Sequence, residues 1–191
     1  MVYTAEADPL CYPGTTVLRN LAGLTDQAEL DDFEFSMYLT RAEEPFPDGD
    51  LGYVHYRLMH HHLFQDVYEW AGEPRTIRTG KGGNWFCYPE YLEQHMSRAF
   101  ATPFIENLQT TVKPADFARG AGHLLAEINA GHPFREGNGR TQLAYLKLLT
   151  SAAGFSFDDD ALEPDRVMHA MIESFSGKLD GLEALIADLI S

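Results

Sequence analysis

The stretch His132-Pro133-Phe134-Arg135-Glu136-Gly137-Asn138-Gly139-Arg140 is a polar island between two apolar segments. It places an imidazole, a carboxylate, two guanidinium groups and two glycines around one asparagine, a mixture that a hydrophobic core does not need. Apolar residues at helical spacing precede and follow it: Phe117, Ala121, Leu124, Leu125 and Ile128 before, and Leu143, Leu146 and Leu149 after. The pattern predicts a short loop held between two buried helices, which suits a functional site on a rigid scaffold.

The second half of this loop has the chemistry of a phosphate site. Gly137-Asn138-Gly139 allows left-handed backbone and close approach of a ligand, so that successive N–H groups can form an anion nest. The nest runs into a predicted helix over 139–153, whose first N–H groups also favour an anion. Arg140 in the first turn opposes the helix dipole unless an anion binds there. We therefore predict that Gly137, Asn138, Gly139 and Arg140 bind the phosphates of a nucleotide.

Two further residues supply the remaining chemistry. The carboxylate of Glu136 would repel a neighbouring phosphate unless a divalent cation lay between them, and Mg²⁺ is commonly held by carboxylates together with substrate phosphates. Glu136 is therefore the predicted Mg²⁺ ligand. His132 can accept a proton near neutral pH, and Phe134 is expected to anchor the loop in the core. The combination predicts attack by a hydroxyl on a nucleotide phosphate, although Gly-Asn-Gly alone is only a common turn.

Length and composition set the frame for this site. The 191 residues predict one domain over 1–191, with 45% hydrophobic and 12% aromatic residues to form its core. A formal net charge of −15 argues against broad binding to nucleic acid or to an anionic membrane. No apolar run approaches the roughly 20 residues of a membrane span, and the N-terminus lacks a signal-peptide pattern. Cys11 and Cys87 have no metal or redox spacing, so a cytoplasmic setting is expected, with secretion into a host left open.

Helical periodicity predicts an all-α bundle with one small β-hairpin, an irregular segment over 1–14 and a core over about 50–155. Pro89 and Pro114 are typical of helix starts, and Gly72 is typical of a left-handed helix end. The expected helices number about eight and cover about 15–23, 27–42, 51–68, 90–107, 115–130, 139–153, 161–175 and 179–190.

The predicted helix over 51–68 carries His55, His60, His61 and His62. One interpretation is a metal site. Consecutive residues on a helix point about 100° apart, however, so three in a row cannot ligate one ion. We favour a polar helix face that includes structural histidines.

Residues 75–88 predict the hairpin. Arg75-Thr76-Ile77-Arg78-Thr79 is rich in β-branched residues, Gly80 to Asn84 form a turn, and Trp85 to Tyr88 return. The hairpin is either a clip that covers the helices or a flap whose open edge pairs with an extended segment of a partner. The cluster of Arg75, Arg78 and Lys81 in an acidic chain favours the flap.

Residues 132–140 resemble the signature of the Fic (Fic/Doc) family, His-x-Phe-x-(Asp/Glu)-Gly-Asn-Gly-Arg-x-x-Arg. Every position matches except the last, where this chain has Leu143. The segments 63–72 and 81–83 also resemble the family's approach to its flap and the flap tip, and the resemblance extends over about 12–191.

The resemblance implies a Fic-type helical bundle and a protein adenylyltransferase, which moves AMP from ATP to a Ser, Thr or Tyr hydroxyl of a target protein. It gives His132 the role of base and Glu136 that of Mg²⁺ ligand, and it assigns Gly137, Asn138, Gly139 and Arg140 to the phosphates. The flap would align the target, and we assign this role to Ile77, Arg78, Thr79 and Lys81. Alternatives are a Doc-like protein kinase, or a Fic-type binding module weakened by the loss of the second arginine.

Two departures bear on activity and regulation. In the family, the arginine replaced by Leu143 helps to hold the terminal phosphate, and Lys147 one turn later is a candidate substitute. We expect this chain to lack the family's inhibitory helix, whose pattern is (Ser/Thr)-x-x-x-Glu-(Gly/Asn). The resemblance therefore extends to members whose inhibitor is a separate small helical antitoxin, and it predicts the toxin or effector half of such a pair.

Overall fold

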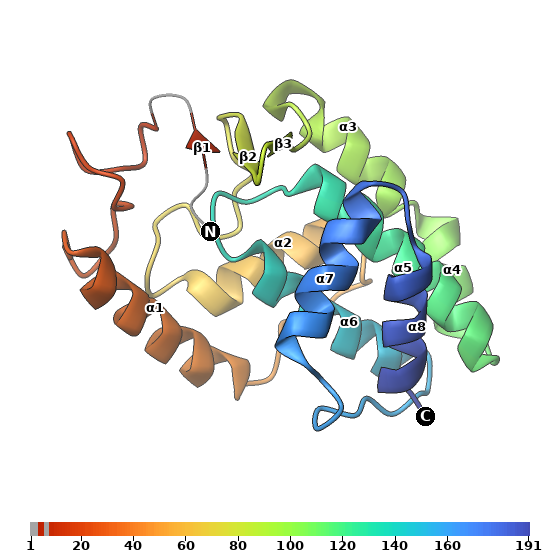
Figure 1. Cartoon of the computed structure of the whole chain (residues 1–191). Coiled ribbons are helices and arrows are strands. Elements are labelled where there is room, and N and C mark those ends of the chain that lie inside the picture. Colours follow the sequence, from red (N-terminus) through yellow and green to blue (C-terminus); the bar gives the residue numbers. More distant parts are fainter. Residues whose placement is uncertain (1–3, 6–7) are drawn as a thin grey trace.

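The computed structural model describes residues 4–5 and 8–191 of the chain, and these form a helical bundle with a small sheet at one end (Figure 1). The expected all-α bundle is confirmed. Its helices in the described residues are α1 (Gln27–Ala42), α2 (Tyr53–Phe64), α3 (Pro89–Ala99), α4 (Thr102–Thr110), α5 (Pro114–Gly131), α6 (Asn138–Ala152), α7 (Pro164–Phe175) and α8 (Asp180–Leu189). The sheet contains β1 (Thr4–Ala5), β2 (Thr79–Lys81) and β3 (Asn84–Trp85), antiparallel and in that order.

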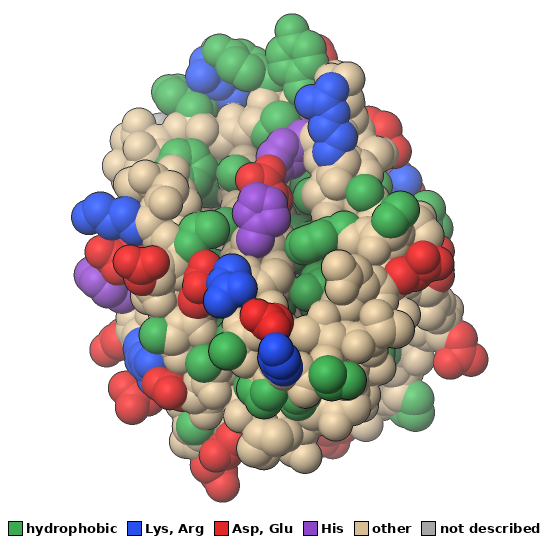
Figure 2. Space-filling view, turned by 90° about the vertical axis from the view of Figure 1, so that its right-hand side faces the viewer, with side chains coloured by type: hydrophobic (Ala, Val, Ile, Leu, Met, Phe, Trp, Pro, Cys, Tyr) green, Lys and Arg blue, Asp and Glu red, His purple; other side chains and the backbone are tan. Residues whose placement is uncertain are grey.

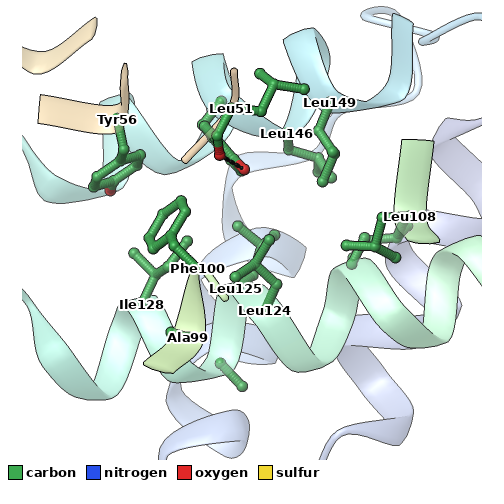
Figure 3. Close-up of a cluster of buried hydrophobic side chains, with 14 of the residues drawn as sticks. Leu51, Tyr56, Ala99, Phe100, Leu108, Leu124, Leu125, Ile128, Leu146 and Leu149 are labelled. Atoms are coloured by element: carbon green, nitrogen blue, oxygen red, sulfur yellow. Dashed lines mark hydrogen bonds between the residues drawn. The ribbon is translucent and has the colours of Figure 1, made fainter. Parts of the chain in front are cut away.

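Helix α5 is the centre of the bundle, and it contacts α3, α4, α6, α7 and α8. Figure 3 shows Leu124, Leu125 and Ile128 of α5 opposite Leu146 and Leu149 of α6, all of them buried. Burial of one such side chain is worth about 1.5–3 kcal/mol. The loop 132–137 therefore connects the ends of two well-anchored helices.

The helix boundaries follow local chemistry, and one of them corrects a prediction. Asp26 caps α1 by accepting hydrogen bonds from the N–H groups of Ala28 and Glu29. The single helix predicted over 90–107 is wrong, because the chain leaves the helix at Phe100 and begins α4 at Thr102. Pro103 in the first turn of α4 has no N–H, and its ring would clash with the carbonyl of Ala99 in a continuous helix.

Two other predicted helices also need correction. Residues 15–23 form turns and irregular backbone, with one isolated β-bridge from Leu18 to Cys11. The side chain of Asn20 stabilises this conformation, because it hydrogen-bonds the carbonyls of Leu18 and Leu24 and the N–H of Leu24. Helix α2 is shorter than the predicted 51–68. It begins after Leu51, which has φ +61°, and ends at Phe64, whose carbonyl accepts bonds from residues 67 and 68 in a tight turn.

The hairpin is present, but its strands are shorter and shifted from the predicted ones. Its turn is Gly82-Gly83, with φ values of +59° and +85°. A two-residue turn with positive φ at both positions matches the twist of the flanking strands. The predicted irregular segment 1–14 contains β1, while residues 1–3 and 6–7 lie outside the described part of the chain.

Charge on the visible surface is mixed rather than segregated. Figure 2 shows the face that lies to the right in Figure 1, where basic side chains stand singly among acidic and hydrophobic ones. Within the described residues, no helix combines the length and the apolar character that crossing a bilayer requires.

Candidate active site

The loop between α5 and α6 is held rigidly by its own side chains. His132 ends α5 in the left-handed conformation, with φ +47°, and Gly137 precedes α6 with φ +79°. The Asn138 side chain accepts a 3.0 Å bond from the N–H of Phe134 and donates a 2.8 Å bond to its carbonyl. Phe134 is completely buried and stacks on His60, with ring centroids 3.7 Å apart. Phe134 thus lies in the core as predicted, and the Asn138 side chain shapes the loop.

The start of α6 presents its N–H groups beside open space. Thr141 is the first residue of α6 whose N–H bonds back, to the carbonyl of Gly137 at 3.0 Å, so the N–H groups before it lack a partner within the helix. A Cβ atom on Gly139 would meet no heavy atom within 4 Å, whereas one on Gly137 would lie 2.5 Å from the Phe64 ring. Gly137 is therefore required by packing, and Gly139 leaves room for a ligand.

A cavity of about 440 Å³ opens at this point. It brings together four predicted site residues, which are His132, Gly139, Arg140 and, from the flap, Lys81. One wall is apolar and comes mainly from α7: Val167, Met168, Met171, Ile172 and Phe175. The other predicted residues lie outside the lining of this cavity: Ile77, Arg78, Thr79, Glu136, Gly137 and Asn138.

His132 is fixed by the flap and kept neutral by its surroundings. Phe86 lies flat against its ring, with centroids 3.8 Å apart and planes 3° from parallel. Burial lowers the pKa of His132 to about 3; the positive charges of Arg75 and Lys81 add to this, and a hydrogen bond with the backbone of Asn129 opposes it. At neutral pH the imidazole is therefore unprotonated, which is the form that a base requires.

Glu136 lies outside the lining of the cavity. It belongs to a group of charges that includes a residue absent from our predictions. Its Oε1 accepts a 2.9 Å bond from the N–H of Gly137 and lies 3.8 Å from Nη2 of Arg140. Burial and the nearby carboxylate of Glu34 raise the pKa of Glu136. Glu34, on α1, also contacts Arg140 directly, and nothing in the sequence near Glu34 marks it for this position.

Arg75 has a different role from the one that we predicted, which was to belong to a basic cluster on the flap. Its guanidinium donates to the carbonyls of Gly131 and His132 at 3.0 and 2.7 Å, and to those of Ile77 and Cys87. It therefore ties both ends of the flap to the end of α5. The predicted basic cluster is not one surface, because Arg78 lies between the rings of Trp85 and Tyr88 at 4.4 and 4.1 Å, and only Lys81 lines the cavity.

The flap edge that we predicted to be open is occupied, so that prediction is wrong for one side. On β2, Gly80 pairs with Thr4 and Thr79 pairs with Ala5 of β1, while β3 pairs on the other side. The N-terminal segment is also held by an ion pair 2.6 Å long between Asp8 and Arg135, both almost completely buried. Sequence patterns miss β1 because it contains only two residues and depends on this distant pairing.

The remaining candidates occupy ordinary positions. Leu143 is partly exposed and lines the cavity. Lys147 forms an ion pair with Asp159 and does not line the cavity, so it gives no support to a substitute role. His55, His60 and His62 hydrogen-bond backbone groups, as the structural interpretation predicts. The described residues contain no group of three or more potential ligands arranged for a metal.

A known family has a sequence pattern that matches residues 50–150, from just before α2 to the last turn of α6. The chain belongs to the Fic/DOC family. A relative from Sinorhizobium fredii (strain NBRC 101917 / NGR234), named probable protein adenylyltransferase y4lH, is 58% identical over 98% of both chains. Protein adenylyltransferase VbhT from Bartonella schoenbuchensis (strain DSM 13525 / NCTC 13165 / R1) is 34% identical over 96% of this Fic chain, which spans 39% of VbhT.

Solved structures agree on the fold. The crystal structure of BepC from Bartonella tribocorum, a VirB-translocated effector with bound AMPPNP, superposes with a TM-score of 0.84 and covers 95% of this chain and 96% of BepC. At 24% identity, this likeness establishes the Fic fold and no more.

Proposed function

We propose that this protein is a protein adenylyltransferase, which transfers AMP from ATP to a hydroxyl side chain of a target protein. The observation that carries the proposal is that His132, Gly139 and Arg140 line one cavity. A neutral imidazole and a phosphate nest then face the same substrate. Relatives that match nearly the whole chain carry this name, one of them at 58% identity.

The cavity suggests how ATP would lie. The phosphates suit the N–H groups at the start of α6 and the guanidinium of Arg140, and the adenine base suits the apolar wall of α7. Lys81 at the flap would add a second cation. A hydroxyl of the target protein, presented along the flap, would then reach the α-phosphate from the side of His132.

The proposed reaction is one displacement at phosphorus. The target oxygen forms a bond to the α-phosphorus while its proton passes to the imidazole of His132. The bond from the α-phosphorus to the bridging oxygen breaks, and pyrophosphate leaves with those electrons. Phe86 and the backbone contacts around His132 hold the ring in one orientation, which favours this step by limiting the motion of the base.

The residues present fit a magnesium ion beside the phosphates. Glu136 would hold it, since its carboxylate is partly exposed and stands 3.8 Å from Arg140. Glu34 and Glu136 carry two negative charges against the one positive charge of Arg140, and a divalent cation would balance the excess negative charge. When bound, Mg²⁺ neutralises charge that develops on the departing pyrophosphate.

The regulation and place of action belong to the same proposal. Thr102 to Asn107 at the start of α4 fit the family's inhibitory pattern, but none of these residues lines the cavity. We therefore propose that a small helical antitoxin would supply the inhibitory glutamate, and that the protein is the toxin or effector partner. Its ATP substrate favours action in the cytoplasm. Copurification of the tagged protein with such a polypeptide from its own cells would test the pairing.

Labelled ATP tests the reaction itself. The protein is incubated with Mg²⁺, cell lysate and ATP labelled at the α- or the γ-phosphate, and labelled proteins are separated by gel. We expect label only from the α-position. His132→Ala should reduce transfer by at least about 100-fold without loss of helical circular dichroism, whereas His61→Ala, which changes an exposed histidine of α2, should retain it.

Other outcomes point to other functions. Label only from the γ-position would make the protein a kinase, and label from neither, with ATP still bound, would make it a binding module. Undiminished transfer by His132→Ala would show that another group accepts the proton.

A further inference from the structure

A buried carboxylate from outside the family loop contacts the loop's arginine. Glu34 of α1 is 8% exposed. Its Oε1 contacts Nη2 of Arg140, and its Oε2 accepts a hydrogen bond from the hydroxyl of Tyr68, which is 2% exposed. Both carboxylate oxygens thus have a partner, and Tyr68 holds the oxygen that Arg140 does not contact.

Arg140 is also confined by aromatic rings. Its guanidinium lies 4.7 Å from the ring centre of Phe64 and 5.3 Å from that of Tyr38. Such stacking restrains the plane of a guanidinium. Within the described part of the chain, both carboxylates that approach Arg140 do so at Nη2, so Nε and Nη1 are the donors that a phosphate can use.

We propose that Glu34, held by Tyr68, is a positioning residue for Arg140 and thereby sets the affinity for nucleotide phosphates. This inference rests on the proposed function for the role of Arg140 at phosphate. A free arginine side chain loses rotamer entropy when it binds an anion. Here the ion pair and the two rings fix the side chain before ATP arrives, and a preorganised donor binds more tightly.

The opposite role would be competition, in which Glu34 withholds Arg140 from the phosphate. The two roles predict opposite results for Glu34→Gln. If Glu34 competes with the phosphate for Arg140, the substitution tightens ATP binding, and if Glu34 positions Arg140, the substitution weakens it. Tyr68→Phe separates them further, since it leaves the charge of Glu34 in place and removes only the hydroxyl that fixes it.

The test measures binding of AMPPNP and of adenosine to the full chain by calorimetry with Mg²⁺ present. We expect Glu34→Gln to weaken AMPPNP binding about 10-fold and Tyr68→Phe about 3-fold. Adenosine, which has no phosphate, should bind all variants equally. Glu29→Gln, which changes an exposed carboxylate on the same helix, is the matched control and should bind AMPPNP like the unaltered protein.

Three results would overturn the proposal: tighter AMPPNP binding by Glu34→Gln, an equal loss of adenosine and AMPPNP binding, or unchanged AMPPNP binding in both variants. If Glu34→Gln fails to fold, Tyr68→Phe decides alone. The binding assay involves no transfer. Absence of label from α-labelled ATP therefore rejects the proposed function, whereas the variants judge the role of Glu34.

Discussion

Two glycines of the loop differ in what they do, and the difference can be measured. Gly139 lies in α6, and an added Cβ there meets no neighbour. Because alanine favours helix over glycine by up to about 1 kcal/mol, we expect Gly139→Ala to keep or slightly raise the thermal midpoint. The new methyl group would stand in the cavity, so AMPPNP binding measured by calorimetry should weaken at least about 10-fold.

Gly137→Ala is the matched comparison, and we expect it to destabilise the fold. The residue has φ +79°, and a Cβ would lie 2.5 Å from the buried Phe64 ring. Such strain and overpacking cost about 1–3 kcal/mol each, so the thermal midpoint should fall. If Gly139→Ala binds AMPPNP normally, the phosphates do not lie at the start of α6.

At the scale of elements, the flap and the N-terminal segment form one assembly. β1 occupies the edge of β2 that an extended target segment could otherwise use. Deleting residues 1–5 retains the Asp8–Arg135 ion pair and should free this edge. Strand pairing holds β1 at this edge by about 1 kcal/mol. Its removal should therefore lower the KM for a target protein about five-fold, measured with α-labelled ATP.

The affinity for AMPPNP serves as the control for this deletion and should stay unchanged. A rise in KM for the target would mean that β1 supports the flap rather than competes at it. The full chain and the shortened chain should be compared at equal helical content.

The same elements show what a sequence can and cannot predict. Local signals placed α1, α5 and α6 within one or two residues, because Asp26, Pro114 and Gly137 act on their own neighbours. The position of the loop between α5 and α6 was also predictable, since the residues that form it are consecutive. Glu34 and β1 were missed, and Arg75 was given the wrong role, because their partners lie far along the chain and no local pattern specifies a contact made by folding.

At the scale of the whole molecule, the net charge is negative, whereas the charged side chains that line the cavity are positive. The chain carries −15 overall, yet the residues that line the cavity include Lys81 and Arg140 and, in the described part of the chain, no carboxylate. Screening limits the reach of the distant acidic groups to about 8 Å at physiological salt. Lys81 and Arg140 are therefore the cations that a nucleotide phosphate would meet in the cavity, while Glu34 and Glu136 beside Arg140 offset their charge from outside the lining.

The two histidines buried beside the loop also make global stability depend on pH. The pKa of both His60 and His132 is lowered to about 3, mainly by burial, whereas in the unfolded chain it is near 6.5. Between these values the unfolded state binds more protons, so stability falls as pH falls. From pH 7.5 to 5.5 we expect the two histidines together to lower the free energy of unfolding by about 3 kcal/mol.

Urea denaturation at a series of pH values would measure this loss. Glu136 acts in the opposite sense, because its raised pKa lets the folded state take up a proton first, but it is one group against two. In His132→Ala about half of the loss should remain, carried by His60. A loss as large as that of the unaltered protein would mean that His132 takes up its proton as readily in the folded state as in the unfolded one, and the imidazole would then not be held neutral at the start of the reaction.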